Sequence, residues 1–544
     1  MKNLLFLLLL FLIVPIQLQA QEKAWFYLRA TDTLILPQFK KVKDQLKYIG
    51  NDSQLKEVLD AYEIYEFKKT YRKAKKKYLK RTFFVMANSE QLLPDLLANV
   101  PNIFESGDVI PSEDKKIYEP NDYGLTSTIG ANIGLQANLD YLDILGLPEA
   151  WYYTTGDKNT IIGISDGQLD TLNPDFRGKT RQLNRSTTSK GHGINISGNA
   201  AAQGDNGYGI TGVCYDCGLL GTQYGGVKTY PELKELADLG IKIINCSWAS
   251  RAFHESGKQV IDEIFEKGTI VVAASGNKKW EETKGKVLHY PASFDNVISV
   301  SSVMYKYESV AENTVITDKG NPAFVNIRGY LGRTGGFVDH DVTKKEKIYP
   351  VSIPTLNPQV DILAPSVDVF MYAHFVEDGS IYYAPYSFTS GIPPLVSGTI
   401  GLMLSMAPCF PINEVEDVLK LTSTNIDHIE ANKPYEGNYG AGMLHTGRAV
   451  KMVYDLYSEK GEARIENQKF TRWNFNLTSY GKNVLIHEQE FTKDATLEVS
   501  AKNQIIIGKN TILRPNRNGG IVLKIDASLQ KPCDLILRDP SIEE

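Results

Sequence analysis

Residues 387–398 read SFTSGIPPLVSG and lead into an apolar run that extends to Met406. Pro393 and Pro394 fit the first turn of a helix, where backbone N–H groups have no intrahelical acceptor. Small residues within the run permit close backbone contact, so we predict a buried helix. Ser390 then lies at its N-terminal end, in a positive field among free N–H donors. A nucleophile that must generate an oxyanion suits this place, although serine is also among the commonest helix caps.

The composition is that of a globular protein with ample length for several cores. The chain has 544 residues, of which 42% are hydrophobic and 23% charged, and its formal net charge is -5. This charge gives no general reason to expect a nucleic-acid partner. The five cysteines are too few for a fold that depends on disulfides.

The first 20 residues have the pattern of a secretory signal peptide. Lys2 is the positive residue, Leu4 to Val14 form the apolar core, and Ala20 is a small residue at the expected cleavage point. The apolar stretch is short for a transmembrane helix, and no later stretch reaches the required length. We therefore expect a secreted, periplasmic or cell-surface protein without an integral membrane segment once the signal is removed. The alternative is an uncleaved N-terminal anchor.

A small α+β unit is predicted over residues 21–112. An apolar stretch at 24–28 precedes a lysine-rich helical region, and a strand at 82–86 and a helix at 92–100 follow. The basic run 68–81 could meet an anionic partner, but we favour the simpler explanation that it is a solvated helix face.

Residues 113–457 are predicted to form an α/β domain, because apolar strands alternate with helical segments from about residue 119 onward. Such alternation is typical of a parallel sheet. A long irregular insertion is expected at 304–359. The predicted strands are 160–165, 219–223, 241–246, 269–275 and 297–303, and the predicted helices are 231–239, 254–267, 413–420 and 448–457.

Residues 458–544 change character, since helical periodicity is replaced by short alternating runs such as 496–499 and 520–525. This pattern predicts a small all-β module, either a sandwich or a few turns of a β-solenoid.

Three polar residues lie in loops near the carboxyl ends of predicted strands, where functional sites of parallel sheets form. Asp166 directly follows the strand 161–165, at the carboxyl end where such sites form. His192 lies between two glycines ahead of a helix of small residues, and Asn277 follows another buried strand. Each has a plain structural alternative, as a loop aspartate, a structural histidine or a turn asparagine. Together with Ser390, however, they could supply an orienting carboxylate, a base, an oxyanion donor and a nucleophile.

Asp, His and Ser in this chain order resemble the triad of the subtilisins. The similarity extends to whole motifs, and on them the chain is identified as a member of the subtilisin-like serine peptidase (subtilase) family, of the secreted bacterial type. The similar motifs are 164–176 around the aspartate, 191–213 around the histidine, 245–247 in the strand that pairs with substrate, 274–277 at the oxyanion site, 290–292 and 363–365 as further landmarks, 389–398 around the serine, and 439–442 at the end of the domain.

The resemblance implies a three-layer α/β domain with a mostly parallel sheet, and an endopeptidase activity. Ser390 would attack the peptide carbonyl, His192 would take its proton, and Asp166 would orient the imidazole. Asn277 and the backbone N–H of Ser390 would bind the oxyanion.

Protein or peptide substrate would pair in extended form with the backbone around Ser247. Gly276 and Trp248 would also line the substrate site. The unit 21–112 resembles a subtilase propeptide in position, which implies a zymogen, and we expect a monomer.

Several residues depart from the family pattern. Gly167 stands where the family usually has a hydroxyl residue beside the aspartate, and Gln168 follows it. Ile194 and Asn195 follow the histidine motif, and Phe388 replaces a usual glycine before the serine. These changes weaken the support of the triad but leave its chemical groups in place. The alternative function is therefore a weak or inactive subtilase-like protein that binds peptides or cell-surface material.

The cysteines suggest one local bond. Cys214 and Cys217 form a Cys-x-x-Cys pair without the second pair that a zinc site needs. A short disulfide is one reading of this pair in an oxidising compartment. Cys246 lies within a strand and is expected to be a buried free thiol.

No cofactor is expected to be required, and no metal ligand is assigned. Asp175, Asp205 and Asn206 are oxygen donors near the place where some subtilases bind calcium. They could hold calcium or could simply be polar loop residues.

Overall fold

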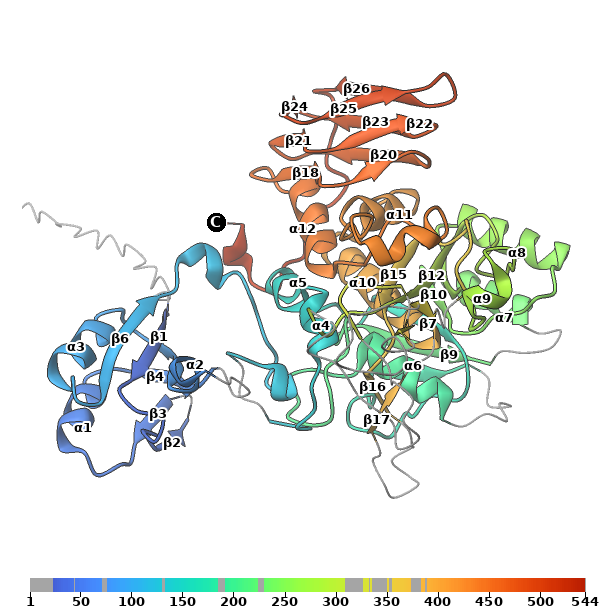
Figure 1. Ribbon diagram of the computed structural model, residues 1–544. Helices are drawn as coiled ribbons and strands as arrows, with labels where there is room; N and C mark the ends of the chain where they lie inside the picture. Colours follow the sequence, from blue (N-terminus) through green and yellow to red (C-terminus); the bar gives the residue numbers. More distant parts are fainter. Residues whose placement is uncertain are drawn as a thin grey trace, which may run out of the picture. The chain divides into compact units, whose positions relative to one another are not determined.

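The computed structural model describes residues 23–43, 45–70, 76–129, 133–183, 191–223, 229–308, 326–331, 333–334, 350–351, 355–372, 383–386 and 389–543. The expected signal peptide and most of the insertion predicted at 304–359 lie outside these residues. The chain forms two compact units, Met1–Lys116 and Ile117–Glu544, which Figure 1 shows in blue and in cyan to red.

The N-terminal unit is an antiparallel sheet with its two longer helices packed on one face. The strand order is β2 (Phe39–Val42), β3 (Gln45–Tyr48), β4 (Ile64–Lys69), β5 (Thr82–Ala87), β1 (Ala24–Ala30) and β6 (Phe104–Val109), and the helices are α1 (Ser53–Asp60), α2 (Lys77–Lys80) and α3 (Leu92–Asn99). Alternate side chains of the central strands, such as Phe26 and Val85, join leucines of α1 and α3 in one core. The predicted strand at 82–86 and helix at 92–100 are present.

The predicted lysine-rich helical region is confirmed only in part within the described residues. Lys68 and Lys69 end the strand β4, and within the described part of the basic run only Lys77–Lys80 is helical. The reason is that Ile64 and Phe67 of β4 are buried in the core. Burying them against the neighbouring strand β5 outweighs the helical preference of the lysines, which remain on the surface.

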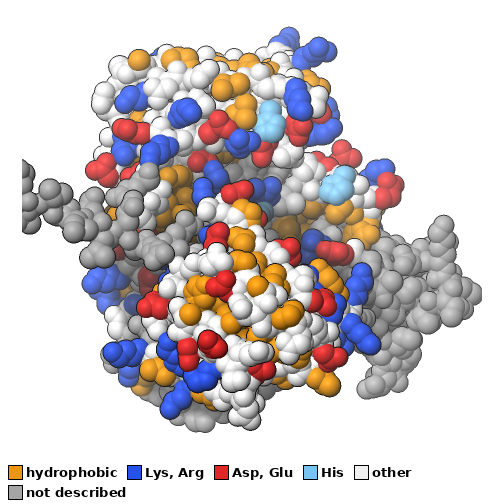
Figure 2. All heavy atoms as spheres, turned by 90° about the vertical axis from the view of Figure 1, so that its left-hand side faces the viewer, with side chains coloured by type: hydrophobic (Ala, Val, Ile, Leu, Met, Phe, Trp, Pro, Cys, Tyr) orange, Lys and Arg blue, Asp and Glu red, His pale blue; other side chains and the backbone are white. Residues whose placement is uncertain are grey.

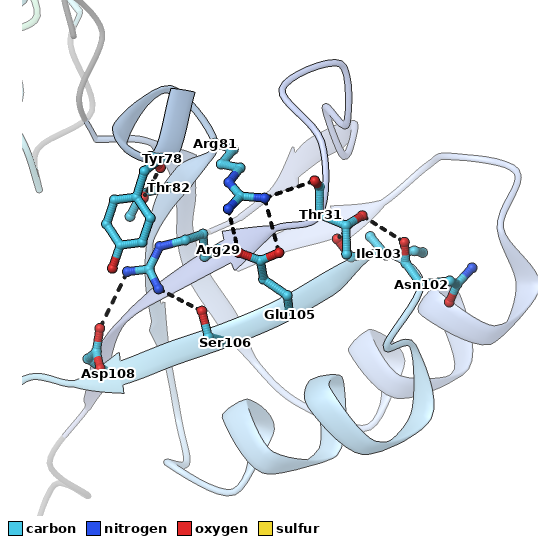
Figure 3. A network of polar contacts seen from close by, with 10 residues as sticks. All are labelled: Arg29, Thr31, Tyr78, Arg81, Thr82, Asn102, Ile103, Glu105, Ser106 and Asp108. Atoms are coloured by element: carbon cyan, nitrogen blue, oxygen red, sulfur yellow. Dashed lines mark hydrogen bonds and ion pairs between the residues drawn. The ribbon is translucent and has the colours of Figure 1, made fainter. Parts of the chain in front are cut away.

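A polar network links β1, the edge strand β6 and the helix α2 (Figure 3). The Arg29 guanidinium donates to Ser106 Oγ at 2.6 Å, pairs with Asp108 and lies 3.8 Å from the Tyr78 ring centroid. Arg81 pairs with Glu105 at 2.7 Å. Because these contacts join β1, β6, α2 and the residue that precedes β5, the N-terminal unit has its own polar framework as well as its own core.

The second unit contains a seven-stranded parallel sheet. Its order is β15 (Ile362–Pro365), β12 (Val297–Val303), β11 (Ile270–Ala274), β10 (Ile243–Cys246), β7 (Ile161–Ser165), β9 (Gly218–Thr222) and β8 (Thr180–Gln182). Every recorded pair in this sheet is parallel. The five predicted strands are all present, and β8 and β15 extend the sheet at its two edges.

Helices cover both faces of this sheet and give the predicted three layers. On one side α6 (His192–Ala201) and α10 (Pro393–Met406) contact each other and the central strands, and on the other side lie α7 (Thr229–Asp238) and α8 (Glu255–Glu266). Successive residues of β10 enter the two cores in turn, Ile243 the first and Ile244 the second. The other elements are α4 (Asp140–Ile144), α5 (Leu147–Tyr153), α9 (Trp280–Thr283), α11 (Ile412–Leu421), α12 (Thr446–Tyr457), β13 (Arg333–Thr334), β14 (Pro350–Val351), β16 (Val369–Tyr372) and β17 (Tyr383–Tyr386).

The C-terminal module is a parallel β-solenoid, the second of the two predicted all-β forms. Its coils stack in three sheets, β18–β21–β24, β19–β22–β25 and β20–β23–β26. The strands are β18 (Glu462–Glu466), β19 (Lys469–Phe470), β20 (Asn474–Ser479), β21 (Asn483–His487), β22 (Glu490–Lys493), β23 (Thr496–Ala501), β24 (Ile505–Ile507), β25 (Ile512–Pro515) and β26 (Gly520–Ile525).

Helix α11 closes the lower edge of the solenoid through two carboxylates. Asp417 accepts the backbone N–H of Asn476 at 2.8 Å, and Glu414 accepts that of Thr478 at 3.1 Å. These side chains replace the strand that would otherwise pair with β20. The solenoid is thus an extension of the α/β domain rather than a loosely linked module.

Two disulfides are present. Cys214 and Cys217 are bonded, and Cys409 is bonded to Cys533, which fastens the C-terminal tail to the segment after α10. The long-range bond was not predicted. Cys246 is a buried free thiol, as expected.

The surface carries charges of both signs. On the face shown in Figure 2, basic and acidic side chains are interspersed among the described residues. Within the part of the chain that the structure describes, none of the helices combines the length and apolarity that crossing a bilayer requires.

Candidate active site

Asp166 is held at the end of the central strand β7. It is fully buried, and its Oδ1 accepts the N–H of Gly167 at 2.6 Å and lies 2.7 Å from His192 Nδ1. Its second oxygen, Oδ2, is buried without a hydrogen-bond partner among the described residues. Both bonds of this carboxylate therefore converge on one oxygen atom.

His192 is the first residue of α6 and follows Gly191, whose φ of 104° few other residues could adopt. A side chain at Gly193 would collide with the carbonyl oxygen of Gly167, so a glycine is needed for the helix to begin beside Asp166. Burial lowers the pKa of His192, but the hydrogen bond and charge of Asp166 outweigh burial and raise the pKa above its ordinary value. The carboxylate is thus placed to stabilise an imidazolium.

Ser390 lies in a single 3-10 turn, η7 (Thr389–Gly391), immediately before α10. The predicted buried helix is present, with Ile392 as its N-cap and prolines in its first turn. The turn η7 contacts α6, the helix that His192 begins. Ser390 itself is 9% exposed, so its hydroxyl is close to the surface but not freely solvated.

Asn277 follows β11 and the turn residue Gly276, which has a φ of 108°. Its Oδ1 accepts the backbone N–H of Thr389 at 2.9 Å and the Thr389 hydroxyl at 2.7 Å. A backbone N–H can only donate, so the amide oxygen must face Thr389 and the Nδ2 group points elsewhere. The exposed asparagine can therefore offer Nδ2 to an oxyanion formed next to Ser390.

Two of the predicted substrate-binding residues, Ser247 and Trp248, form hydrogen bonds with residues of the central strands β10 and β7. Ser247 is 2% exposed, and its Oγ accepts from Asn245 Nδ2 at 2.9 Å, so only its backbone is suited to contact a peptide. Trp248 donates through Nε1 to Ser165 Oγ at 3.1 Å. Trp248 is partly exposed and packs edge-to-face with Tyr230.

Two supporting residues were missed in the sequence. Thr389 anchors Asn277, and the signal that could have found it is the hydroxyl residue directly before the proposed nucleophile. His289 packs against Gly276, because a Cβ there would lie 2.7 Å from His289 Nδ1. Its position just before the 290–292 motif was the available signal. Both residues restrain the turn that carries Asn277.

The three residues considered for calcium already form hydrogen bonds with other protein groups. Asp175 accepts from Asn206 Nδ2 at 2.8 Å and from the Tyr372 hydroxyl, and Asp205 accepts from the Tyr118 hydroxyl at 2.6 Å. Among the described residues no group of three or more His, Cys, Asp or Glu side chains could hold a metal ion. A calcium ion would have to replace these donors, so the residues do not fit calcium in this arrangement.

Comparisons with known proteins show the family of this chain. The model of the subtilase family matches residues 157–442, more than half of the chain. Subtilisin DY from Bacillus licheniformis is 25% identical over 272 residues, covering 49% of this chain and 79% of the relative. Thermitase from Thermoactinomyces vulgaris is 30% identical over 169 residues, covering 28% of this chain and 58% of the relative.

A longer relative and a solved structure are also similar to this chain. The halolysin-like extracellular serine protease Nep of Natrialba magadii is 23% identical over 351 residues, 60% of this chain and 53% of that protein. The crystal structure of fervidolysin from Fervidobacterium pennivorans aligns with a TM-score of 0.45 at 16% identity, covering 79% of this chain and 61% of that one. On the family match, the chain belongs to the subtilase family of serine endopeptidases, which are hydrolases.

Proposed function

We propose that the protein is an exported endopeptidase that cleaves peptide bonds with Ser390, His192 and Asp166, assisted by Asn277. The observation that carries this assignment is the 2.7 Å contact between His192 Nδ1 and Asp166 Oδ1 at the start of α6, with the Ser390 turn packed against that helix. A contact on Nδ1 leaves Nε2 as the nitrogen that can accept a proton.

The reaction follows from these positions. Ser390 Oγ attacks the peptide carbonyl carbon as His192 Nε2 takes the hydroxyl proton, and the carbonyl oxygen becomes an oxyanion. Asn277 Nδ2 and the Ser390 backbone N–H donate to that oxyanion. His192 then gives the proton to the leaving amine, the C–N bond breaks, and an acyl-serine remains. Water attacks this ester by the same route and releases the acid.

Export and restraint by the N-terminal unit are part of the proposal. Residues 1–20 have the pattern of a secretory signal, and the related proteins include one named as extracellular and one named as cell wall-associated. The separate core and polar network of the N-terminal unit are consistent with a propeptide that folds before it is removed.

The test compares the wild-type protein with Ser390→Ala on an unfolded protein substrate and on a chromogenic peptide. We expect hydrolysis by the wild type and its loss in the variant, by about a million-fold, as when the serine of such a triad is removed. The circular-dichroism spectrum and melting temperature should stay unchanged. Turnover by the folded variant near the wild-type rate would reject Ser390 as the nucleophile.

A further inference from the structure

The last coil of the solenoid has an open edge. Strands β24, β25 and β26 pair with β21, β22 and β23 on one side, and within the described part of the chain no strand pairs with them on the other. Figure 1 shows these three strands at the end of the stack that lies away from α11. At the opposite edge, two carboxylates of α11 accept N–H groups of β20. The open edge therefore presents backbone donors and acceptors that can pair with a further strand.

The apolar core of the solenoid is uncovered at this edge. By register, Ile507 of β24 stacks on Ile486, and Ile525 of β26 stacks on Ala501. Ile486 and Ala501 are 0% and 2% exposed, whereas Ile507 is 56% exposed and Ile525 is 52% exposed. The other inward-facing apolar residues of the last coil are only partly buried, namely Ile505, Leu513, Ile521 and Leu523. A further strand would remove this apolar surface from water, as the last coil does for the coil below it.

The last coil differs in charge from the coil below it. Among Lys, Arg, Asp and Glu, residues 503–526 contain four basic and one acidic residue, whereas residues 481–502 contain three basic and four acidic residues. The single acidic residue, Asp526, pairs with Lys524 at 2.8 Å. The remaining basic residues are exposed and form no ion pair within the described chain, and they are Lys509, Arg514 and Arg517. They lie on β25 and in the turns before and after it, so the open edge carries a positive charge.

These features select the kind of partner. Unpaired strand edges bind an extended backbone, because the backbone groups of a helix are already bonded to each other. A second copy of this chain, stacked end to end, would bring the basic residues of both last coils into one interface, where like charges repel. Acidic side chains would instead pair with those basic residues. The edge therefore suits an acidic extended segment better than a second copy.

We propose that the open edge binds an extended segment of a partner protein in which apolar and acidic residues alternate. The segment adds as a strand to β25. Because successive side chains of a strand point to opposite faces, its apolar side chains cover inward-facing residues such as Leu513, and its acidic side chains lie on the outer face beside Arg514. Lys509 and Arg517 add positive charge at the two ends of β25. None of these residues belongs to the proposed active site.

The test uses the full chain with Ser390→Ala, so that the peptide probe is not cleaved. The probe is a fluorescent synthetic peptide in which glutamate alternates with isoleucine or valine, and fluorescence anisotropy measures its binding. We expect saturable binding that weakens as ionic strength rises. A peptide with lysine in place of glutamate should bind at least about tenfold more weakly, because its charges are repelled. Of two versions N-methylated at alternate residues, the one that blocks the pairing edge should also lose about tenfold or more, through its missing hydrogen bonds.

Variants locate the site on the last coil. Arg514→Glu with Arg517→Glu reverses two exposed charges and should weaken binding of the glutamate peptide by about tenfold or more. Ile507→Lys places a charge in the uncovered apolar surface and should weaken binding by a similar factor. The matched control, Arg181→Glu with Lys482→Glu, reverses two exposed charges outside the last coil and should bind as the parent does. The melting temperature of each variant confirms that it is folded.

Three results would overturn the proposal. The first is absence of saturable binding, and the second is equal binding of the glutamate and lysine peptides or of the Arg514→Glu, Arg517→Glu variant and its control. The third is a dimer in analytical ultracentrifugation that Ile507→Lys dissociates, because a second copy would then occupy the edge. Equal binding of both N-methylated peptides and the unmodified one would also exclude strand addition.

Discussion

Replacing Gly167 with serine should strengthen the support of Asp166. The carboxylate is fully buried, and both of its recorded bonds fall on Oδ1, while Oδ2 has no partner among the described residues. Gly167 is not one of the glycines with positive φ in the described chain, so a serine can adopt its backbone. The new hydroxyl would supply the donor that Oδ2 lacks.

The size of the effect follows from this missing bond. A hydrogen bond to a charged group contributes about 1.5–3 kcal/mol. Only the part that is stronger in the transition state raises turnover, because a bond that is equally strong in the ground state leaves the barrier unchanged. If about 1 kcal/mol falls in that part, kcat rises about fivefold. The remainder should appear as higher stability.

The assay compares kcat on a chromogenic peptide and the melting temperature for wild type, Gly167→Ser and Gly167→Ala. The alanine variant is the matched control, because it adds the same Cβ without the hydroxyl. We expect the serine variant to exceed the alanine variant in both quantities. Equal kcat and equal melting temperature in two folded variants would show that Asp166 already has its full support.

Three further outcomes are expected. Asn277→Ala or Asn277→Leu should lower kcat by about a hundred- to a thousand-fold, the range typical for loss of an oxyanion donor, with little change in substrate binding. A higher KM with an unchanged kcat would instead make Asn277 a substrate-binding residue. The segment 21–112 should reversibly inhibit a mature form that starts near Tyr118 when it is added as a separate chain. The segment would instead be an accessory domain if it does not inhibit in trans and if a form made without it folds normally and is active. Burial raises the pKa of Glu414 and of Asp417 to about 7, so the folded state holds these protons more tightly and the melting temperature should fall as pH rises from about 4.5 to 7. In the Ser390→Ala background, Glu414→Gln with Asp417→Asn should reduce this slope, and an unchanged slope would assign it to other groups.

Local patterns predicted the central elements because each is set by nearby residues. Asp166 follows a strand whose residues are all apolar or small, and such a short run is typical of a buried strand in a parallel sheet. Its two prolines and its apolar sequence predict the helix after Ser390. These signals need no knowledge of distant parts of the chain.

Other features depend on contacts between distant residues and left no local trace. The Cys409–Cys533 bond joins residues 124 positions apart. The bond from Thr389 to Asn277 crosses 112 positions. The basic run has the composition of a helix, yet its first residues, Lys68 and Lys69, end the strand β4, because their neighbours Ile64 and Phe67 are buried in the core. Such choices are made by tertiary packing, which single-sequence patterns do not record.

The central claim is that Ser390 is an activated nucleophile. A fluorophosphonate probe reacts with such a serine, and mass spectrometry locates the modified residue. We predict labelling of the mature wild-type protein at Ser390, none in Ser390→Ala, and strongly reduced labelling in His192→Ala, because the base is then missing. Failure of the folded, mature wild-type protein to react, or labelling that remains in Ser390→Ala, would contradict the account.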